Sequence, residues 1–122
     1  MRVLILDDSA TIREIVKIYL MNEGLTFTEA GDGESGLASV RRGEVPHLVL
    51  ADLKMPRLDG MGFLKALRSD ARTQKVPVVI LTGEKAPRIR ETVLAAGALD
   101  VLYKPITAPA LQGAIRRVRE AQ

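Results

Sequence analysis

The stretch HLVLADLKMPRLDG, residues His47–Gly60, indicates the fold most directly. Its residues 48–51 are all apolar, and this run ends at Asp52. Such a run is typical of a strand that is buried on both faces of a parallel sheet. Pro56 and the pair Asp59-Gly60 then predict that the chain turns out of the sheet. Because open α/β sheets bind ligands beside the carboxyl ends of their strands, Asp52 is a candidate functional residue.

Composition limits the classes of protein to which this chain can belong. It has 122 residues, of which 47% are hydrophobic and 27% charged, so we predict one globular domain over residues 1–122. The net charge of +3 is too small to indicate nucleic-acid binding by itself. The absence of cysteine excludes disulfides, thiolate metal sites and thiol nucleophiles. No stretch reads as a signal peptide or a membrane span, and we therefore expect a cytoplasmic protein without membrane insertion.

Apolar runs and helical periodicity divide the whole chain into alternating strands and helices. We expect strands at residues 3–6, 25–30, 47–52, 76–81 and 101–103. We expect helices from about Ala10 to Gly24, from the turn at 31–34 to Gly43, from Gly60 to about 69, from Pro87 to 96, and over 107–120. Ser9 or Thr11 can cap the first of these helices, and Thr107 the last. Because crossovers between parallel strands are right-handed, this alternation predicts a parallel sheet covered on both faces, a three-layer α/β sandwich.

Polar residues follow four of these strands directly. Asp7 and Asp8 follow the first strand, Asp52 ends the third, and Thr82 and Lys104 follow the fourth and fifth. Parallel strands bring their carboxyl ends to one edge of the sheet, so we expect these side chains to converge. Three acids and one lysine leave a formal charge of −2 there, which a divalent cation would balance. An all-oxygen site without His or Cys favours Mg²⁺ or Mn²⁺ over zinc.

This set of side chains suits one reaction. A carboxylate can attack phosphorus and form an aspartyl phosphate. Phosphoryl transfer requires mainly positioning and neutralisation of charge, which the cation and Lys104 would supply. The hydroxyl of Thr82 could donate a hydrogen bond to a phosphoryl oxygen.

The same residues resemble the receiver domain of the bacterial response regulators, and the resemblance covers the whole chain. The matching motifs are individually weak and jointly specific: Asp7-Asp8-Ser9 with Arg13, Asp52-Leu53-Lys54-Met55-Pro56 with Asp59-Gly60, Thr82-Gly83, Gly97-Ala98 and Lys104-Pro105. The resemblance implies a flavodoxin-like sheet of order 2-1-3-4-5 with five helices.

It also implies a mechanism and its partners. Asp52 would accept a phosphoryl group from a phosphohistidine of a sensor kinase or phosphotransfer protein, with Thr82 and Lys104 assisting. Asp7, Asp8, Asp52 and the backbone carbonyl of Lys54 would hold Mg²⁺, with Asp8 as a direct ligand and Asp7 acting through water. The Lys104-Pro105 peptide would be cis. The chain would signal to a downstream protein as a monomer or a weak phosphorylation-dependent dimer, without contacting nucleic acid directly.

Two further features concern signalling. Many receivers carry an aromatic residue where this chain has Val101, and Tyr103, on the same strand face, could partly replace it. We predict that the helix over 87–96, the last strand and the helix over 107–120 form the partner surface, made basic by Arg88, Arg90, Arg116 and Arg119. We also predict an ion pair between Lys54 and Glu84 at the rim of the site.

Other functions on the same architecture are less well supported. The acids after the first strand would repel a flavin phosphate, and no Gly-x-Gly-x-x-Gly motif follows a strand. A haloacid-type phosphatase would have an acid where Lys54 stands. A receiver-fold interaction module that does not use phosphorylation remains the alternative.

Overall fold

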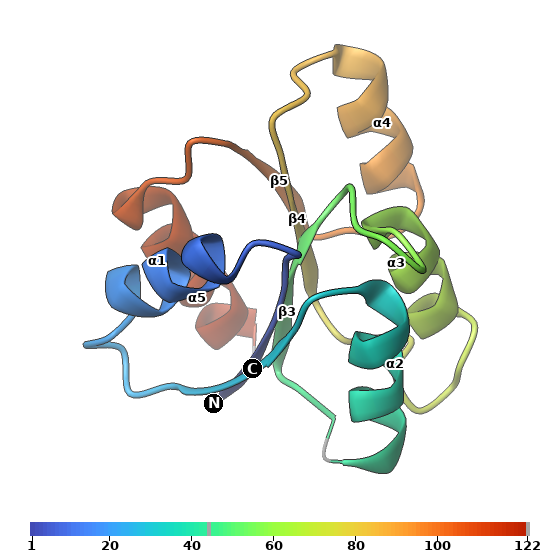
Figure 1. Cartoon of the computed structure of the whole chain (residues 1–122), viewed down its shortest axis with the longest axis horizontal. Helices are drawn as coiled ribbons and strands as arrows, with labels where there is room; N and C mark the ends of the chain where they lie inside the picture. Colours follow the sequence, from blue (N-terminus) through green and yellow to red (C-terminus); the bar gives the residue numbers. More distant parts are fainter. Residues whose placement is uncertain (44, 122) are drawn as a thin grey trace.

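The computed structural model describes residues 1–43 and 45–121, and its strands form one parallel sheet of order β2-β1-β3-β4-β5 (Figure 1). This order and the alternation of elements confirm the predicted flavodoxin-like fold. The elements are β1 (Arg2–Leu6), α1 (Ala10–Tyr19), β2 (Thr26–Ala30), α2 (Gly33–Arg42), β3 (Leu48–Asp52), α3 (Gly60–Arg68), β4 (Val78–Thr82), α4 (Pro87–Ala95), β5 (Asp100–Tyr103) and α5 (Ala108–Ala121).

Helices cover both faces of the sheet, as a three-layer sandwich requires. Figure 1 shows α1 and α5 on one side and α2, α3 and α4 on the other. Each face has its own apolar cluster: Val16 of α1 and Ile115 of α5 pack on one side, and Phe63 of α3 and Val93 of α4 on the other. Every residue of β3 and β4 is buried, which explains why their sequences are continuous apolar runs. No described helix is long and apolar enough to cross a membrane.

Several element boundaries differ from those expected, among them the following three. Strand β4 begins at Val78 because Pro77 has no N–H to donate and the N–H of Val76 bonds to the Thr73 carbonyl in a turn. Helix α1 ends at Tyr19, where the N–H of Leu20 is shared between two carbonyls and closes the last turn. Gly24 therefore does not cap the helix, and its φ of +69° turns the chain into β2 instead. Strand β5 begins one residue earlier than expected, at Asp100.

The loops that enter the helices are held by short polar side chains at the carboxyl edge of the sheet. The hydroxyl of Ser9 accepts from the Ile12 N–H at 3.2 Å, and that of Thr107 accepts from the Ala110 N–H at 3.3 Å. Both caps match the sequence prediction. Asp59 caps α3 by accepting from the Gly62 N–H at 2.8 Å. These caps fix the places at which the chain leaves β1, β3 and β5.

Candidate functional site

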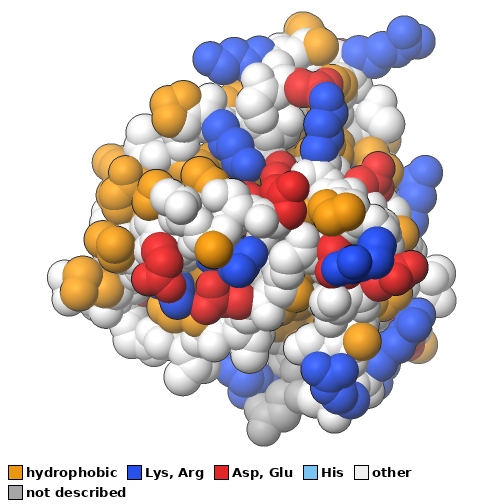
Figure 2. Space-filling model, viewed as in Figure 1, with side chains coloured by type: hydrophobic (Ala, Val, Ile, Leu, Met, Phe, Trp, Pro, Cys, Tyr) orange, Lys and Arg blue, Asp and Glu red, His pale blue; other side chains and the backbone are white. Residues whose placement is uncertain are grey.

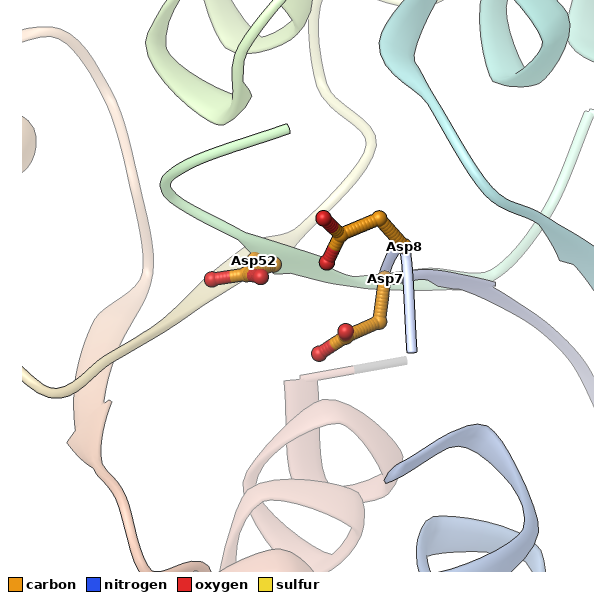
Figure 3. A group of neighbouring side chains, drawn as sticks. All are labelled: Asp7, Asp8 and Asp52. Carbon is orange, nitrogen blue, oxygen red and sulfur yellow. The ribbon is translucent and has the colours of Figure 1, made fainter. Parts of the chain in front are cut away.

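The carboxyl ends of the strands bring three predicted acids together. One carboxylate oxygen from each of Asp7, Asp8 and Asp52 lies within 4.8 Å of the others. Figure 3 shows Asp7 and Asp8 leaving the end of β1 beside Asp52 at the end of β3. The register explains this, because Leu6 of β1 pairs with Ala51 of β3, so that the residues that follow them lie side by side. In Figure 2, acidic side chains gather near the middle of this face with basic side chains beside them.

Asp7 and Asp8 are neighbours in sequence but differ in environment. The Asp7 side chain is only 1% exposed, and both of its oxygens are engaged. Oδ1 accepts from the Ser9 N–H at 2.9 Å, and Oδ2 accepts from Lys104 Nζ at 3.1 Å. Asp8 is exposed to solvent. The cluster thus contains one carboxylate whose oxygens are both hydrogen-bonded within the protein, Asp7, and one that is open to solvent, Asp8.

Asp52 is the second buried acid, with a side chain that is 11% exposed. Burial and then the charge of Asp7 raise its pKa, and contacts with Lys104 and with the backbone N–H of Lys54 only partly offset this. Lys104 Nζ lies 3.3 Å from Asp52 Oδ2, so the ammonium bridges the two buried acids. Burial lowers the pKa of Lys104, but the hydrogen bond and charge of Asp7 and the charge of Asp52 outweigh it and the pKa is raised. Lys104 therefore stays charged.

Thr82, at the end of β4, is buried, and its hydroxyl accepts from the Glu84 N–H at 3.0 Å. A hydroxyl that accepts in this way keeps its own proton for another acceptor. The Thr82 carbonyl accepts from the Lys104 N–H at 2.8 Å, which joins the ends of β4 and β5. The Lys104-Pro105 peptide is cis, as the resemblance implied.

Lys54 and Glu84 form the predicted ion pair. The side chain of Lys54 is 79% exposed and that of Glu84 is 35% exposed, so the pair lies at the rim of the site in contact with water. The hydrogen bond and charge of Glu84 raise the pKa of Lys54.

The acid cluster is chemically suited to a divalent cation. Its donors are all carboxylate oxygens, which hard cations prefer. Two oxygens bound to one Mg²⁺ at about 2.1 Å are at most about 4.2 Å apart. A cluster of this width therefore fits one ion after a small contraction, or with one acid binding through water.

A second polar contact lies close to this edge and is not predicted by the sequence pattern. Arg57, in the loop after β3, donates to Asp32 at the start of α2, with Nη2 2.6 Å from Oδ2. The sequence predicts only a polar turn over residues 31–34, which includes Asp32. A capping Asp can be recognised from its position before a helix, but nothing local to residue 57 indicates its partner.

The predicted partner surface is less basic than its composition suggests. Arg90 of α4 and Arg117 of α5 both pair with Asp100 of β5, at 3.3 and 2.8 Å. Arg119 pairs with Glu23 at 3.1 Å. Two of the four arginines expected to make this surface basic, Arg90 and Arg119, therefore have acidic partners.

The sequence and fold match known proteins closely. The family model described as "Response regulator receiver domain" matches residues 3–116. A probable chemotaxis protein CheY of Rhizobium etli is 37% identical over 96% of this chain and 91% of its own length. The structure of the chemotaxis response regulator CheY4 of Vibrio cholerae superposes with a TM-score of 0.87 at 32% identity, covering 96% of this chain and 97% of that one.

A longer relative shows the same domain in another setting. The probable transcriptional regulator ycf27 of Porphyridium aerugineum is 38% identical over 96% of this chain, which spans 47% of that protein. The similarity thus covers nearly all of this chain in both short and long relatives. The chain belongs to the response regulator receiver family, the receiving domains of two-component signalling systems.

Proposed function

We propose that this receiver is a Mg²⁺-dependent phosphorylation switch in which Asp52 accepts the phosphoryl group. The observation that carries the proposal is the position of Asp52, at the end of the central strand, 3.3 Å from Lys104 and within 4.8 Å of two further acids. A carboxylate placed in this way is a nucleophile whose surroundings already contain the groups that neutralise phosphoryl charge.

In the proposed step, a carboxylate oxygen of Asp52 attacks the phosphorus of a phosphohistidine on a sensor kinase or phosphotransfer protein. The new O–P bond forms as the P–N bond breaks, and the imidazole nitrogen of the donor keeps the electron pair and takes up a proton. The ammonium group of Lys104, which contacts the Asp52 carboxylate before the reaction, would then neutralise charge on the phosphoryl oxygens. Thr82 donates a hydrogen bond from its hydroxyl to one of these oxygens, because the hydroxyl oxygen accepts from the Glu84 N–H and its proton remains available.

Asp8, Asp52 and the Lys54 carbonyl would hold Mg²⁺ directly. Asp8 is exposed and open to an ion from solvent, whereas Asp7 already accepts two hydrogen bonds and would act through water. When bound, the ion would supply positive charge to the phosphoryl oxygens.

The signal would leave through the surface of α4, β5 and α5 toward a downstream protein in the cytoplasm. Arg88 and Arg116 are exposed on this surface, and Asp100 links α4 to α5 through its two arginines. A change at Thr82 would reach β5 through the hydrogen bond between the Thr82 carbonyl and Lys104. Val101 and Tyr103 pack into the same apolar cluster, which supports the idea that Tyr103 partly replaces the missing aromatic residue.

Intact-protein mass spectrometry tests this proposal. Incubation with phosphoramidate should add one phosphoryl group in Mg²⁺ and none in EDTA, and Asp52→Asn should abolish the addition. Asp59→Asn is the matched control, because Asn caps a helix as well as Asp does. Full labelling of Asp52→Asn would refute Asp52 as the acceptor. A wild-type chain that is not labelled but still binds a partner would favour the interaction module without phosphorylation.

A further inference from the structure

The loop that carries Lys54, residues 53–59, is here called the acceptor loop. Two of its residues have backbone angles that L-amino acids rarely adopt: φ is +59° at Arg57 and +148° at Leu58. Neither residue has the conformational freedom of glycine, so surrounding contacts must hold the loop in this shape.

Those contacts come from the first turn of α2. The N–H of Gly33 donates to the Leu58 carbonyl at 3.0 Å. A Cβ on Gly33 would lie 2.2 Å from that oxygen and 2.7 Å from the Leu58 Cβ. The loop therefore lies against the helix so closely that no side chain fits between them.

An ion pair also joins the acceptor loop to the start of α2. Arg57 Nη2 lies 2.6 Å from Asp32 Oδ2, and the Asp32 side chain is only 4% exposed. The Asp32 carboxylate also accepts from the Ser35 N–H at 2.7 Å and from the Ser35 hydroxyl at 3.0 Å. The hydrogen bond from Arg57, followed by that from the Ser35 backbone, lowers the pKa of Asp32 to about 2. Asp32 is thus a buried, charged anchor to which the exposed Arg57 side chain attaches.

The other end of the loop is tied to the site itself. The N–H of Leu53 donates to the Leu81 carbonyl at 3.0 Å, and the N–H of Gly60 donates to the Leu53 carbonyl at 2.9 Å. The Lys54 N–H interacts with the Asp52 carboxylate. Lys54 therefore lies between the acceptor residue on one side and the contact with α2 on the other.

We propose that Arg57 is a positioning residue, and that its ion pair with Asp32 holds the acceptor loop so that the Lys54 carbonyl and the Asp52 carboxylate face a common cation. This inference rests on the function proposed above. It adds a role for two residues, 25 positions apart, that do not touch the acid cluster.

The sign of the charge change makes Arg57→Ala an informative variant. Removing a cation should by itself slightly strengthen the binding of Mg²⁺ through long-range electrostatics. If the ion pair positions the loop, Mg²⁺ binding should instead weaken. A loss of affinity therefore cannot come from the change in net charge. Arg116→Ala on α5 removes the same charge from an exposed position and is the matched control.

The Mg²⁺ dissociation constant should be measured on the full chain from amide chemical shifts, with urea unfolding of each variant recorded in parallel. We expect Arg57→Ala to raise the dissociation constant about tenfold, the lower end of the range for residues that support metal ligands from outside. Arg57→Lys should stay close to wild type. In an Asp32→Asn background, which keeps the helix cap, Arg57→Ala should have little further effect, since the two residues act as a unit.

Unchanged Mg²⁺ affinity in Arg57→Ala, or an undiminished further loss in the Asp32→Asn background, would overturn the positioning role. The phosphoramidate labelling of wild type separates this failure from failure of the proposed function. If wild type is labelled at Asp52 and Arg57→Ala binds Mg²⁺ normally, only the positioning role is wrong. If wild type is not labelled at Asp52 but Arg57→Ala weakens Mg²⁺ binding, the positioning role stands and the phosphorylation switch is wrong.

Discussion

Replacing Asp8 by Asn should make the metal-free protein more stable and at the same time weaken its binding of Mg²⁺. Oxygens of Asp7, Asp8 and Asp52 lie within 4.8 Å of one another. At this separation, two unit charges repel by about 3.5 kcal/mol at an effective dielectric constant near 20, and by about 0.9 kcal/mol in bulk water. Asp8 is exposed and Lys104 offsets part of the repulsion, so we expect a net gain of about 1–2 kcal/mol in the free energy of unfolding.

The effect of Mg²⁺ should have the opposite sign. A ligand that binds only the folded state stabilises it by RT ln(1 + [L]/Kd), so a tenfold weaker site yields about 1.4 kcal/mol less at saturation. In EDTA, the free energy of unfolding of Asp8→Asn should therefore be larger than that of wild type. The difference should shrink as Mg²⁺ is added. The two proteins should approach equal stability at high Mg²⁺.

Urea unfolding followed by far-UV circular dichroism measures both effects, since the chain has no Trp to report by fluorescence. Glu120→Gln, on the exposed side of α5, removes one negative charge far from the cluster and controls for net charge. An equal Mg²⁺ gain in wild type and Asp8→Asn would show that Asp8 is not a ligand. A metal-free Asp8→Asn less stable than wild type would refute the repulsion argument itself.

Three further predictions follow from the same site. The raised pKa of Asp52 means that its carboxyl stabilises the fold below the unfolded value of about 3.9, and that this stabilisation is lost as pH rises through the higher folded value. In EDTA, Asp52→Asn should therefore have a larger free energy of unfolding than wild type at pH 7, and this difference should shrink toward pH 4. Urea unfolding of both proteins across that pH range measures the difference. A difference that stays constant or grows toward pH 4 would contradict the prediction. If the Lys54 stem, paired with Glu84 at the rim of the site, shields the phosphorylated Asp52 from water, Lys54→Ala should speed the loss of phosphate; an unchanged decay rate in excess Mg²⁺ would show no shielding. Phosphorylation should shift amide resonances of α4, β5 and α5, and unchanged resonances there would exclude this surface as the partner site.

Local sequence was sufficient for the order of elements and for the identity of the clustered side chains. Runs of apolar residues that end in Asp52 or Thr82 carry both pieces of information, because the apolar run and the polar residue that ends it are consecutive in the chain. Convergence then follows from parallel pairing alone, without any knowledge of side-chain packing. The boundaries that differed, at Pro77 and Gly24, depended on which backbone groups were already hydrogen-bonded.

Only the tertiary structure shows how residues of the same type differ in burial and in their contacts. Asp7 and Asp8 are identical and adjacent, yet only Asp7 faces Lys104 and is buried, because successive residues leaving a strand point to opposite sides. The pairing of Arg57 with Asp32 joins residues 25 positions apart. The ion pair forms because α2 packs closely on the loop after β3. The sequence of neither segment indicates how close this packing is.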